Sequence, residues 1–429
     1  MALTGRAALV ALVGTLAALV LRSTAGLLLV DGCIVAAILA DIALAASVRK
    51  LQFSRSGDTR IMLGQHGCTT LAVVNPGRRD LRGVLRDSWQ PSAGATERAA
   101  LRIPARGRAE VTTTLEPTRR GDKVAGRVTV RSVGPLGLAA RQGSRDVPWT
   151  VRVLPPFLSR KHLPEKMALL RQLDGQHRSL IRGQGSEFDS LREYVIGDDV
   201  RSIDWRSSAR RSDILVRTWR PERDRRVLIV LDTGRTSASR VAGLPRLDAA
   251  MDAALLLAAL AIRAGDRVDL LAVDSQVRAR IVGANRAEVL PLITDALALL
   301  EPELTETDGA LLATTVLAVA RRRCLLVLLT DLNPAAIETG LLPVIPLLAS
   351  RHQILVAATA DPRLAELTAG RADPAAVYAA AAAERAVAER ARATGQLTSY
   401  GVEVIEAAPD RLAPALADAY LGLKRAGRL

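Results

Sequence analysis

The run VLIVLD at residues 227–232 is apolar until it ends in a carboxylate, and charged residues precede it. This pattern is typical of a strand that is buried on both faces in a parallel sheet. Further strands are predicted at 268–273, 324–330, 353–358 and 402–405, and helices at 247–263, 286–300, 309–320, 334–349, 374–394 and 411–424. The alternation predicts a doubly wound α/β domain over residues 225–429.

Two carboxylates lie where the predicted strands of this domain end. Asp232 ends the first strand, Asp331 follows the strand at 324–330, and the loop TETD at 305–308 comes between them in the sequence. Ligands of open α/β sheets bind at this carboxyl edge. Mg²⁺ prefers oxygen ligands, which carboxylates and hydroxyls on separate loops can supply. The edge is therefore a candidate Mg²⁺ site, with the alternative that both aspartates cap a helix or a turn without an ion.

The segment before this domain has a different period. Short alternating runs at 69–74, 99–103, 109–115, 123–130 and 150–154 are separated by turn residues such as Asn75-Pro76-Gly77. This spacing predicts a small β-sandwich over residues 56–156. A basic connector follows at 157–224, and its first part, 156–182, has apolar residues at helical spacing.

Two apolar runs, 7–21 and 25–48, occupy the N-terminus on either side of Arg22. They predict a transmembrane helical hairpin over residues 1–50, although a cleaved signal peptide at 1–24 is an alternative. Arg49, Lys50 and Arg55 follow the second run. The positive-inside rule then places both ends in the cytoplasm, which predicts a two-pass cell-membrane protein with cytoplasmic soluble domains.

The composition narrows the function classes. The net charge of +15 favours an anionic partner, but aromatic residues make up only 3% of the 429 residues, too few for single-strand stacking platforms. The four histidines and three cysteines show no metal-ligand spacing, and no nucleophile-elbow or phosphate-loop motif is present. We therefore expect neither nucleic-acid binding nor catalysis.

The connector ends in a dense charged stretch, GSEFDSLREYVIGDDVRSIDWRSSARRSDILVRTWRPERD, at residues 185–224, which we call the strap. Its alternating charges predict ion pairs that dock it onto the α/β domain, with Trp205 and Trp219 as apolar anchors. A partner-binding surface is the second interpretation, since arginines and aromatic anchors are enriched at interface hot spots. The candidate interaction residues are Glu187, Phe188, Arg192, Tyr194, Asp198, Asp199, Arg201, Asp204, Trp205 and Arg210.

The strap closely resembles the signature of bacterial membrane proteins in the domain-of-unknown-function family 58, where it leads into a von Willebrand factor A-like domain. The resemblance implies that fold, and with it a metal-ion-dependent adhesion site built from D-x-S-x-S, a threonine and a further aspartate. Here the first motif reads DTGRT at 232–236, so Gly234 replaces one serine. The implied ligands of Mg²⁺ are Asp232, Thr236, Thr307 and Asp331. The family's turns R-R-G and P-L-G-L correspond to 119–121 and 135–138.

The resemblance also implies a partnership with a MoxR-type AAA+ ATPase. The expected function is thus a membrane-anchored protein-interaction module, an adaptor or assembly factor that contacts lipid through its anchor. A metal-dependent hydrolase using Asp232 and Asp331 is one alternative. A basic module that binds anionic lipid or nucleic acid is the other.

Overall fold

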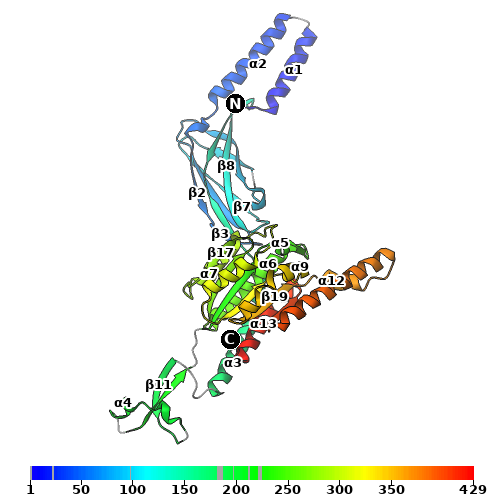
Figure 1. Ribbon diagram of the computed structural model, residues 1–429. Coiled ribbons are helices and arrows are strands. Elements are labelled where there is room, and N and C mark those ends of the chain that lie inside the picture. Colours follow the sequence, from blue (N-terminus) through cyan, green and yellow to red (C-terminus); the bar gives the residue numbers. More distant parts are fainter. Residues whose placement is uncertain are drawn as a thin grey trace. The chain divides into compact units, whose positions relative to one another are not determined.

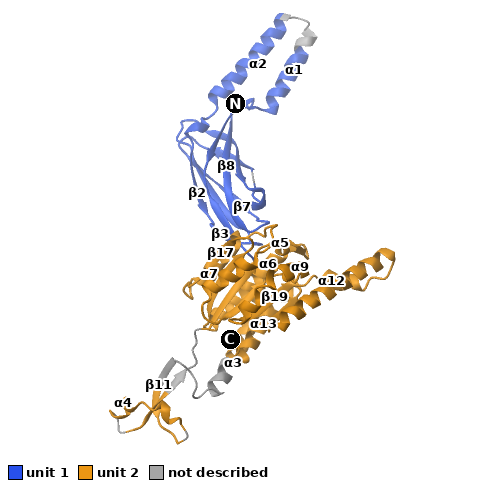
Figure 2. Cartoon of the chain, in the orientation of Figure 1, with its two compact units in different colours: residues 1–156 blue, residues 157–429 orange. Residues whose placement is uncertain are grey.

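The computed structural model describes residues 2–21, 24–96, 98–180, 187–196, 198–210, 213–220 and 225–429. The chain divides into two compact units, Met1–Pro156 and Phe157–Leu429 (Figures 1 and 2). Each unit has its own hydrophobic core, so each is described by itself.

Unit 1 begins with two apolar helices, α1 (Gly5–Leu21) and α2 (Thr24–Leu44). They pack closely, because a Cβ on Gly14 would lie 2.8 Å from the Ile34 side chain. Among the described residues, the segment Ala25–Lys50, with a mean hydropathy of 2.4, is long and apolar enough to cross a membrane. Gly5–Ala17 is a shorter apolar helix. Of the two expected crossings, only the second run therefore reaches spanning length.

Asp41 joins α2 to the rest of unit 1. Its carboxylate is fully buried and accepts hydrogen bonds from the backbone N–H groups of Leu136, Leu138 and Ala139 at 2.7–2.8 Å. A Cβ on Gly134 would lie 2.2 Å from Asp41 Oδ1, so glycine is required there. The P-L-G-L segment is thus a turn that binds this carboxylate.

Within the described residues, two β-sheets of unit 1 enclose a common core. One consists of β1 (Ala2–Leu3), β9 (Ala139–Asp146), β8 (Gly121–Val133), β10 (Thr150–Leu154), β3 (Arg60–Met62), β5 (Leu81–Trp89) and β6 (Arg98–Ile103). The other consists of β2 (Gln52–Gly57), β4 (Gly67–Val74) and β7 (Arg108–Leu115). Leu71 and Val73 of β4 pack with Leu85 of β5 and Val130 of β8, which joins the two sheets as in a sandwich.

Strands β2, β5 and β9 were not predicted from the sequence. In β5 only every second or fourth residue is buried, and β9 buries only its first two residues, so their apolar signal is weak. Arg55, counted among the charges that follow the second apolar run, is buried in the sandwich rather than exposed beside the membrane. Its guanidinium makes a bidentate ion pair with Asp87 at 2.7–2.8 Å, and both side chains are buried.

Unit 2 contains a mixed sheet with helices on both faces. Among the described residues its strand order is β17 (Val277–Ile281), β16 (Arg267–Val273), β13 (Arg226–Asp232), β18 (Leu325–Leu329), β19 (Gln353–Thr359) and β20 (Glu403–Ala407). The strands are parallel except β17, which pairs antiparallel with β16 and which the sequence analysis missed. Its sequence VRARI carries two arginines on an edge strand, so it lacks the apolar run of a central strand.

The alternate side chains of β13 enter two separate cores. Ile229 and Leu231 pack with α6 (Arg246–Arg263), α7 (Val289–Leu299) and α13 (Pro409–Arg425). Leu228 and Val230 pack with α8 (Gly309–Val319), α10 (Ile345–Ala349) and α12 (Pro374–Ser399). The predicted α/β arrangement with a buried central strand is therefore confirmed.

The remaining elements of unit 2 are short or lie before the sheet. The connector helix α3 (Leu163–Leu180) buries Leu163, Leu170 and Leu173 in the core that also contains α6 and α13. The others are β11 (Glu187–Glu193), α4 (Trp205–Ser208), β12 (Leu215–Arg220), α5 (Arg235–Ala238), β14 (Arg240–Val241), β15 (Leu244–Pro245), α9 (Pro334–Ala336), the π-helical turn Ile337–Leu341 and α11 (Pro362–Thr368). Single 3₁₀ turns lie at Val48–Lys50, Pro91–Ala93, Leu158–His162 and Val200–Ser202.

Replacing Asp41 tests whether its carboxylate holds α2 on the sandwich. Asp41→Asn should lower the free energy of unfolding of unit 1 by about 3 kcal/mol, because an amide N–H₂ would face N–H donors that lose their acceptor. Thermal unfolding of the full chain in mild detergent measures this change. Asp31→Asn is the matched control, since Asp31 is an exposed carboxylate on the same helix. Equal effects of the two substitutions would contradict the assignment.

Candidate functional site

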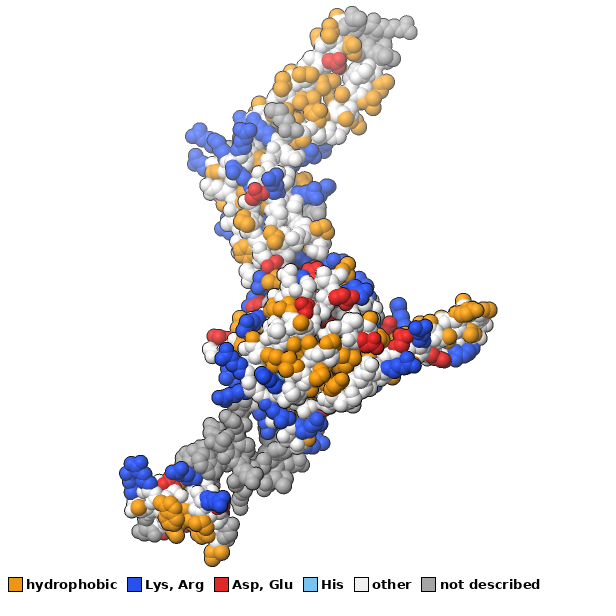
Figure 3. Space-filling view, in the orientation of Figure 1, with side chains coloured by type: hydrophobic (Ala, Val, Ile, Leu, Met, Phe, Trp, Pro, Cys, Tyr) orange, Lys and Arg blue, Asp and Glu red, His pale blue; other side chains and the backbone are white. Residues whose placement is uncertain are grey.

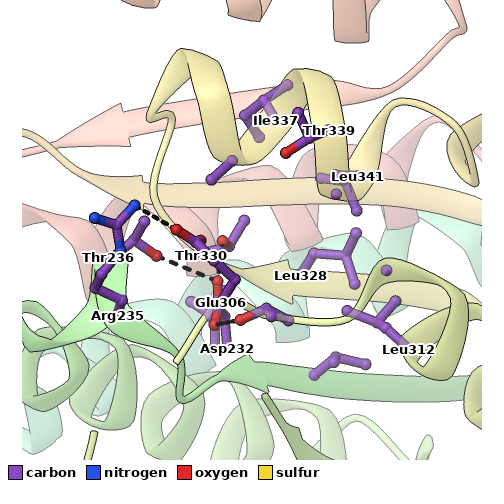
Figure 4. A pocket seen from close by; sticks show the side chains of 16 residues that line it. Asp232, Arg235, Thr236, Glu306, Leu312, Leu328, Thr330, Ile337, Thr339 and Leu341 are labelled. Carbon is purple, nitrogen blue, oxygen red and sulfur yellow. Dashed lines mark hydrogen bonds and ion pairs between the residues drawn. The ribbon is translucent and has the colours of Figure 1, made fainter. Parts of the chain in front are cut away.

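A small pocket lies at the carboxyl edge of the unit 2 sheet (Figure 4). Asp232 is the last residue of β13, Thr330 follows β18, and Thr307 lies in the loop before α8. The cavity has a volume of about 60 Å³. Its polar lining comes from Asp232, Arg235, Thr236, Glu306, Thr307, Thr330 and Thr339, and its apolar lining includes Leu312, Leu328, Ile337 and Leu341.

The carboxylate of Asp232 is surrounded by donors. Oδ1 accepts hydrogen bonds from the Thr307 hydroxyl at 2.5 Å and from the Gly234 N–H at 2.8 Å. Oδ2 accepts from Thr330 at 2.6 Å and from Thr236 at 3.5 Å. The predicted residues Asp232, Thr236 and Thr307 therefore do meet, and the structure adds Thr330, which the sequence analysis treated only as a strand end.

Burial is the largest influence on the charge of Asp232. It raises the pKa of this carboxyl above its usual value, although the hydrogen bonds from Thr307, Thr330 and Gly234 favour the charged form. A carboxyl whose pKa rises on folding binds its proton more tightly in the folded state. Its contribution to stability is therefore lost as pH rises from the unfolded pKa of 3.8 through the raised folded pKa. The ionised form of Asp232 is thus less favourable in the folded chain than in the unfolded chain.

Close packing in the pocket, rather than a special backbone angle, explains why residue 234 is a glycine. Its φ is −76°, which any residue can adopt, but a Cβ there would lie 2.3 Å from Thr307 Oγ1 and 3.0 Å from the Thr305 carbonyl oxygen. Thr307 therefore occupies the space that a serine side chain at 234 would need. A Gly234→Ser substitution would displace Thr307 from Asp232 instead of adding a hydroxyl ligand.

Asp331 does not join the other predicted ligands. It is paired with two arginines, Arg246 at the start of α6 and Arg390 of α12, whose Nη1 lies 2.9 Å from Asp331 Oδ1. Arg390 also pairs with Glu406 at 2.6 Å. Burial opposes the charge of Arg390, but the two carboxylates outweigh it and raise the pKa of the guanidinium.

The residues fit a Mg²⁺ ion poorly. Two guanidinium groups already neutralise Asp331, and Thr307 fills the position of the missing serine. Within the described part of the chain, no three His, Cys, Asp or Glu side chains are grouped as metal ligands. Asp331 is therefore better explained as the centre of an ion-pair network than as a metal ligand.

The strap forms a hairpin in which β11 pairs antiparallel with β12. Among the described strap residues the ion pairs are internal to the hairpin: Arg192 pairs with Asp198 at 2.5 Å, and Arg217 pairs with Asp204 at 2.8 Å. Asp199 caps the turn at Val200–Ser202 by accepting from the Arg201 N–H, and Asp204 caps α4 by accepting from the Ser207 N–H. The charges thus shape the hairpin itself, whereas the sequence analysis expected them to dock it onto the α/β domain.

Two further candidate residues of the strap lie in the described part of the hairpin. The Tyr194 N–H donates to the Ile214 carbonyl at 2.8 Å, and Arg210 is exposed at the end of the α4 turn. The side chains of Glu187, Phe188 and Trp219, and residues 185–186 and 221–224, lie outside the described part of the structure.

The strap exposes several large apolar side chains. Ile196 is 96% exposed, Trp205 64%, Val195 61% and Val200 58%. Trp205 is therefore not the buried anchor that the sequence analysis expected. The sequence YVIGDDV at 194–200 already places three apolar residues among residues that form turns and caps. It does not show that they are exposed, because their exposure depends on how the hairpin folds.

Comparison with known proteins supports part of the family resemblance. The family described as "Protein of unknown function DUF58" matches residues 190–388, which contain most of the strap and much of the α/β domain. Uncharacterized proteins of Mycobacterium bovis and Mycobacterium tuberculosis are 28% identical over 208 residues. This match covers 48% of the chain and 64% of each relative, so it spans less than two thirds of the relatives' length.

The solved structures found to be similar differ too much from this chain to indicate its fold or function. A CARDB domain from Pyrococcus furiosus is 13% identical with a TM-score of 0.19, covering 24% of this chain and 92% of that one. A GH20 exo-β-N-acetylglucosaminidase from Vibrio harveyi is 11% identical with a TM-score of 0.21, covering 83% and 75%. These TM-scores are too low to carry a structural comparison.

Calorimetric titration tests the poor fit of the pocket to metal. Mg²⁺ or Mn²⁺ added to the full chain in detergent should give no saturable heat, because the Asp331 carboxylate is already neutralised. Asp232→Ala is the control for heat arising elsewhere. Saturable binding that disappears in Asp232→Ala would show instead that the pocket holds the ion.

Proposed function

We propose that this chain is a membrane-anchored protein-interaction module, an adaptor or assembly factor that works with a MoxR-type AAA+ ATPase. The observation that carries the proposal is the strap, whose charges pair internally while Ile196, Trp205 and Val200 remain exposed. Apolar side chains held outward on a structured hairpin are suited to a partner's pocket. Most of the strap also lies in the segment that matches the family.

The α/β domain supplies a second contact surface in this proposal. A von Willebrand A-like fold would present the carboxyl edge with Asp232, Thr236 and Thr307 to the partner. Burial raises the pKa of Asp232 and so disfavours its charge, which is common where a group serves function rather than stability. Beside it, Arg235 is 57% exposed and pairs with exposed Glu306. We propose that a partner's charged side chain competes for this surface pair.

A non-catalytic role is part of the same proposal. Both oxygens of Asp232 accept hydrogen bonds, and both arginine partners of Asp331 are largely buried. The metal-dependent hydrolase alternative requires both carboxylates to hold an ion, and these hydrogen bonds and ion pairs compete with such a role. The ATPase partner would supply the nucleotide chemistry.

Trp205→Ala distinguishes a contact residue from a core residue. The melting temperature of the full chain should change little, because the ring is 64% exposed, whereas retention of the ATPase on immobilised protein with ATP and Mg²⁺ should fall about tenfold or more. Tyr378→Ala is the matched control, since Tyr378 is a 79% exposed aromatic residue on α12. Undiminished retention by both Trp205→Ala and Ile196→Ser would overturn the role of the strap.

The two-pass topology with cytoplasmic domains is the finer part of the localisation proposal. It can be tested with native Cys68, which is exposed on β4, while Cys324 is buried. A membrane-impermeant maleimide should label Cys68 only after the cells are lysed. Cys68→Ser identifies any signal from Cys33. Labelling of intact spheroplasts at the same rate as lysate would place the sandwich outside the cytoplasm.

A further inference from the structure

Five exposed arginines gather at one end of the sandwich of unit 1. Arg82 of β5 lies directly opposite Arg102 of β6 in the antiparallel ladder. Arg131 of β8 is opposite Val84, two residues along β5 from Arg82. Arg78 and Arg106 lie on adjacent loops, which the Arg106 N–H joins by donating to the Gly77 carbonyl at 3.0 Å. We call these residues the arginine cluster.

The cluster lacks compensating charge. In the described part of the chain, Arg82 and Arg102 form no ion pair, although directly opposed residues of a ladder have Cβ atoms only about 5 Å apart. Like charges in this position repel each other. Nearby acids are engaged elsewhere: Asp80 accepts from the Ala105 N–H, and Glu110 pairs with Arg108. The pair Arg82 and Arg102 therefore gains from an anion that binds between or above the two guanidiniums.

The same end of the sandwich carries the C-terminal end of α2. Arg79, next to the cluster, donates to the Ala43 carbonyl of α2, and Arg141 donates to the Ile42 carbonyl at 2.8 Å. Asp41 binds the turn at 135–138, which lies between β8 and β9. Figure 3 shows the Lys and Arg side chains gathered on the part of unit 1 from which the apolar helices extend. When α2 spans a bilayer, its last turn and the cluster both lie at headgroup level.

We propose that the arginine cluster binds the phosphate headgroups of anionic phospholipids. The inference rests on the membrane anchoring of the proposed function, but not on its ATPase partner. Guanidinium groups form bidentate hydrogen bonds with phosphate oxygens, and a bilayer surface offers such anions at the height at which α2 holds the sandwich. Anionic lipid thus relieves the repulsion between Arg82 and Arg102 and fixes the sandwich against the membrane.

The test uses the purified full chain in non-ionic detergent, titrated with dihexanoyl phosphatidylglycerol and followed by native mass spectrometry. The double variant Arg82→Gln/Arg102→Gln should weaken binding about 25-fold, since each basic residue at a membrane surface contributes on the order of a fivefold preference. Dihexanoyl phosphatidylcholine should bind weakly to every form.

Arg86→Gln/Arg98→Gln is the matched control. These arginines are opposed on the same two strands, about 14 Å further from α2, and Arg86 has an interaction partner of its own. The control should change affinity less than twofold. Equal weakening by both double variants would reduce the effect to general attraction and overturn the proposal.

Two further measurements distinguish lipid binding from nucleic-acid binding and test the membrane anchor by itself. A short DNA duplex that binds the cluster more tightly than phosphatidylglycerol does would overturn the lipid assignment in favour of nucleic acid. Alkaline carbonate extraction of membranes tests the anchor independently. Loss of the wild-type chain from carbonate-washed membranes would contradict the proposed anchoring, whereas retention with an unchanged lipid affinity in Arg82→Gln/Arg102→Gln would contradict the cluster alone.

Discussion

Burial of β13 on both faces is the constraint on which the organisation of unit 2 depends. Leu228 and Val230 enter one core while Ile229 and Leu231 enter the other, so no polar side chain can be placed along the strand without a large cost. Polar groups can only follow where the strand ends. This is why Asp232 and the threonines at 307 and 330 meet at one edge, and why the pocket lies there.

Charge neutralisation within the domain then determines what that edge can bind. A metal-ion-dependent adhesion site would balance its carboxylates with a divalent cation. Here Arg246 and Arg390 perform that balance at Asp331, with Arg390 extending the network to Glu406. Removing either partner of such a buried pair is far more costly than removing an exposed one, because an uncompensated charge is left in a low-dielectric setting. The network ties α6, α12 and β20 to the loop after β18, so the position of α12 and the shape of this edge are interdependent.

The sequence predicted the parts of the fold that depend on local pattern. Continuous apolar runs identified the buried parallel strands, whereas β5, β9 and β17 were missed because arginines and other polar residues interrupt the apolar pattern of each strand. Three of the four site residues meet as predicted, since strand ends fix where Asp232 and its neighbours lie. Asp331 was misassigned because Arg390 reaches it from a helix 59 positions later in the sequence, and no local pattern reports such a contact. Trp205 was predicted to be a buried anchor because an aromatic residue in a charged run is often one. The folded hairpin shows instead that its ring faces solvent.

Whether a charged or apolar side chain has a partner inside the fold indicates whether it serves stability or binding. The buried carboxylates of Asp41, Asp87 and Asp266 each have strong donors within the fold, namely backbone N–H groups, Arg55 and Lys424. Groups of this kind are retained because losing their partners would destabilise the folded state. Within the described residues, the exposed apolar side chains of the strap and the opposed pair Arg82 and Arg102 have no such internal compensation. Folding stability does not require these residues in their positions. The free energy of the protein falls when a surface outside the chain covers one of the apolar side chains or neutralises one of the charges. The two surfaces also differ in what they can accept, because Ile196 and Trp205 gain from desolvation while Arg82 and Arg102 gain from an anion. The two proposals, a protein partner for the strap and a lipid headgroup for the sandwich, therefore rest on the same physical criterion applied to two different chemistries.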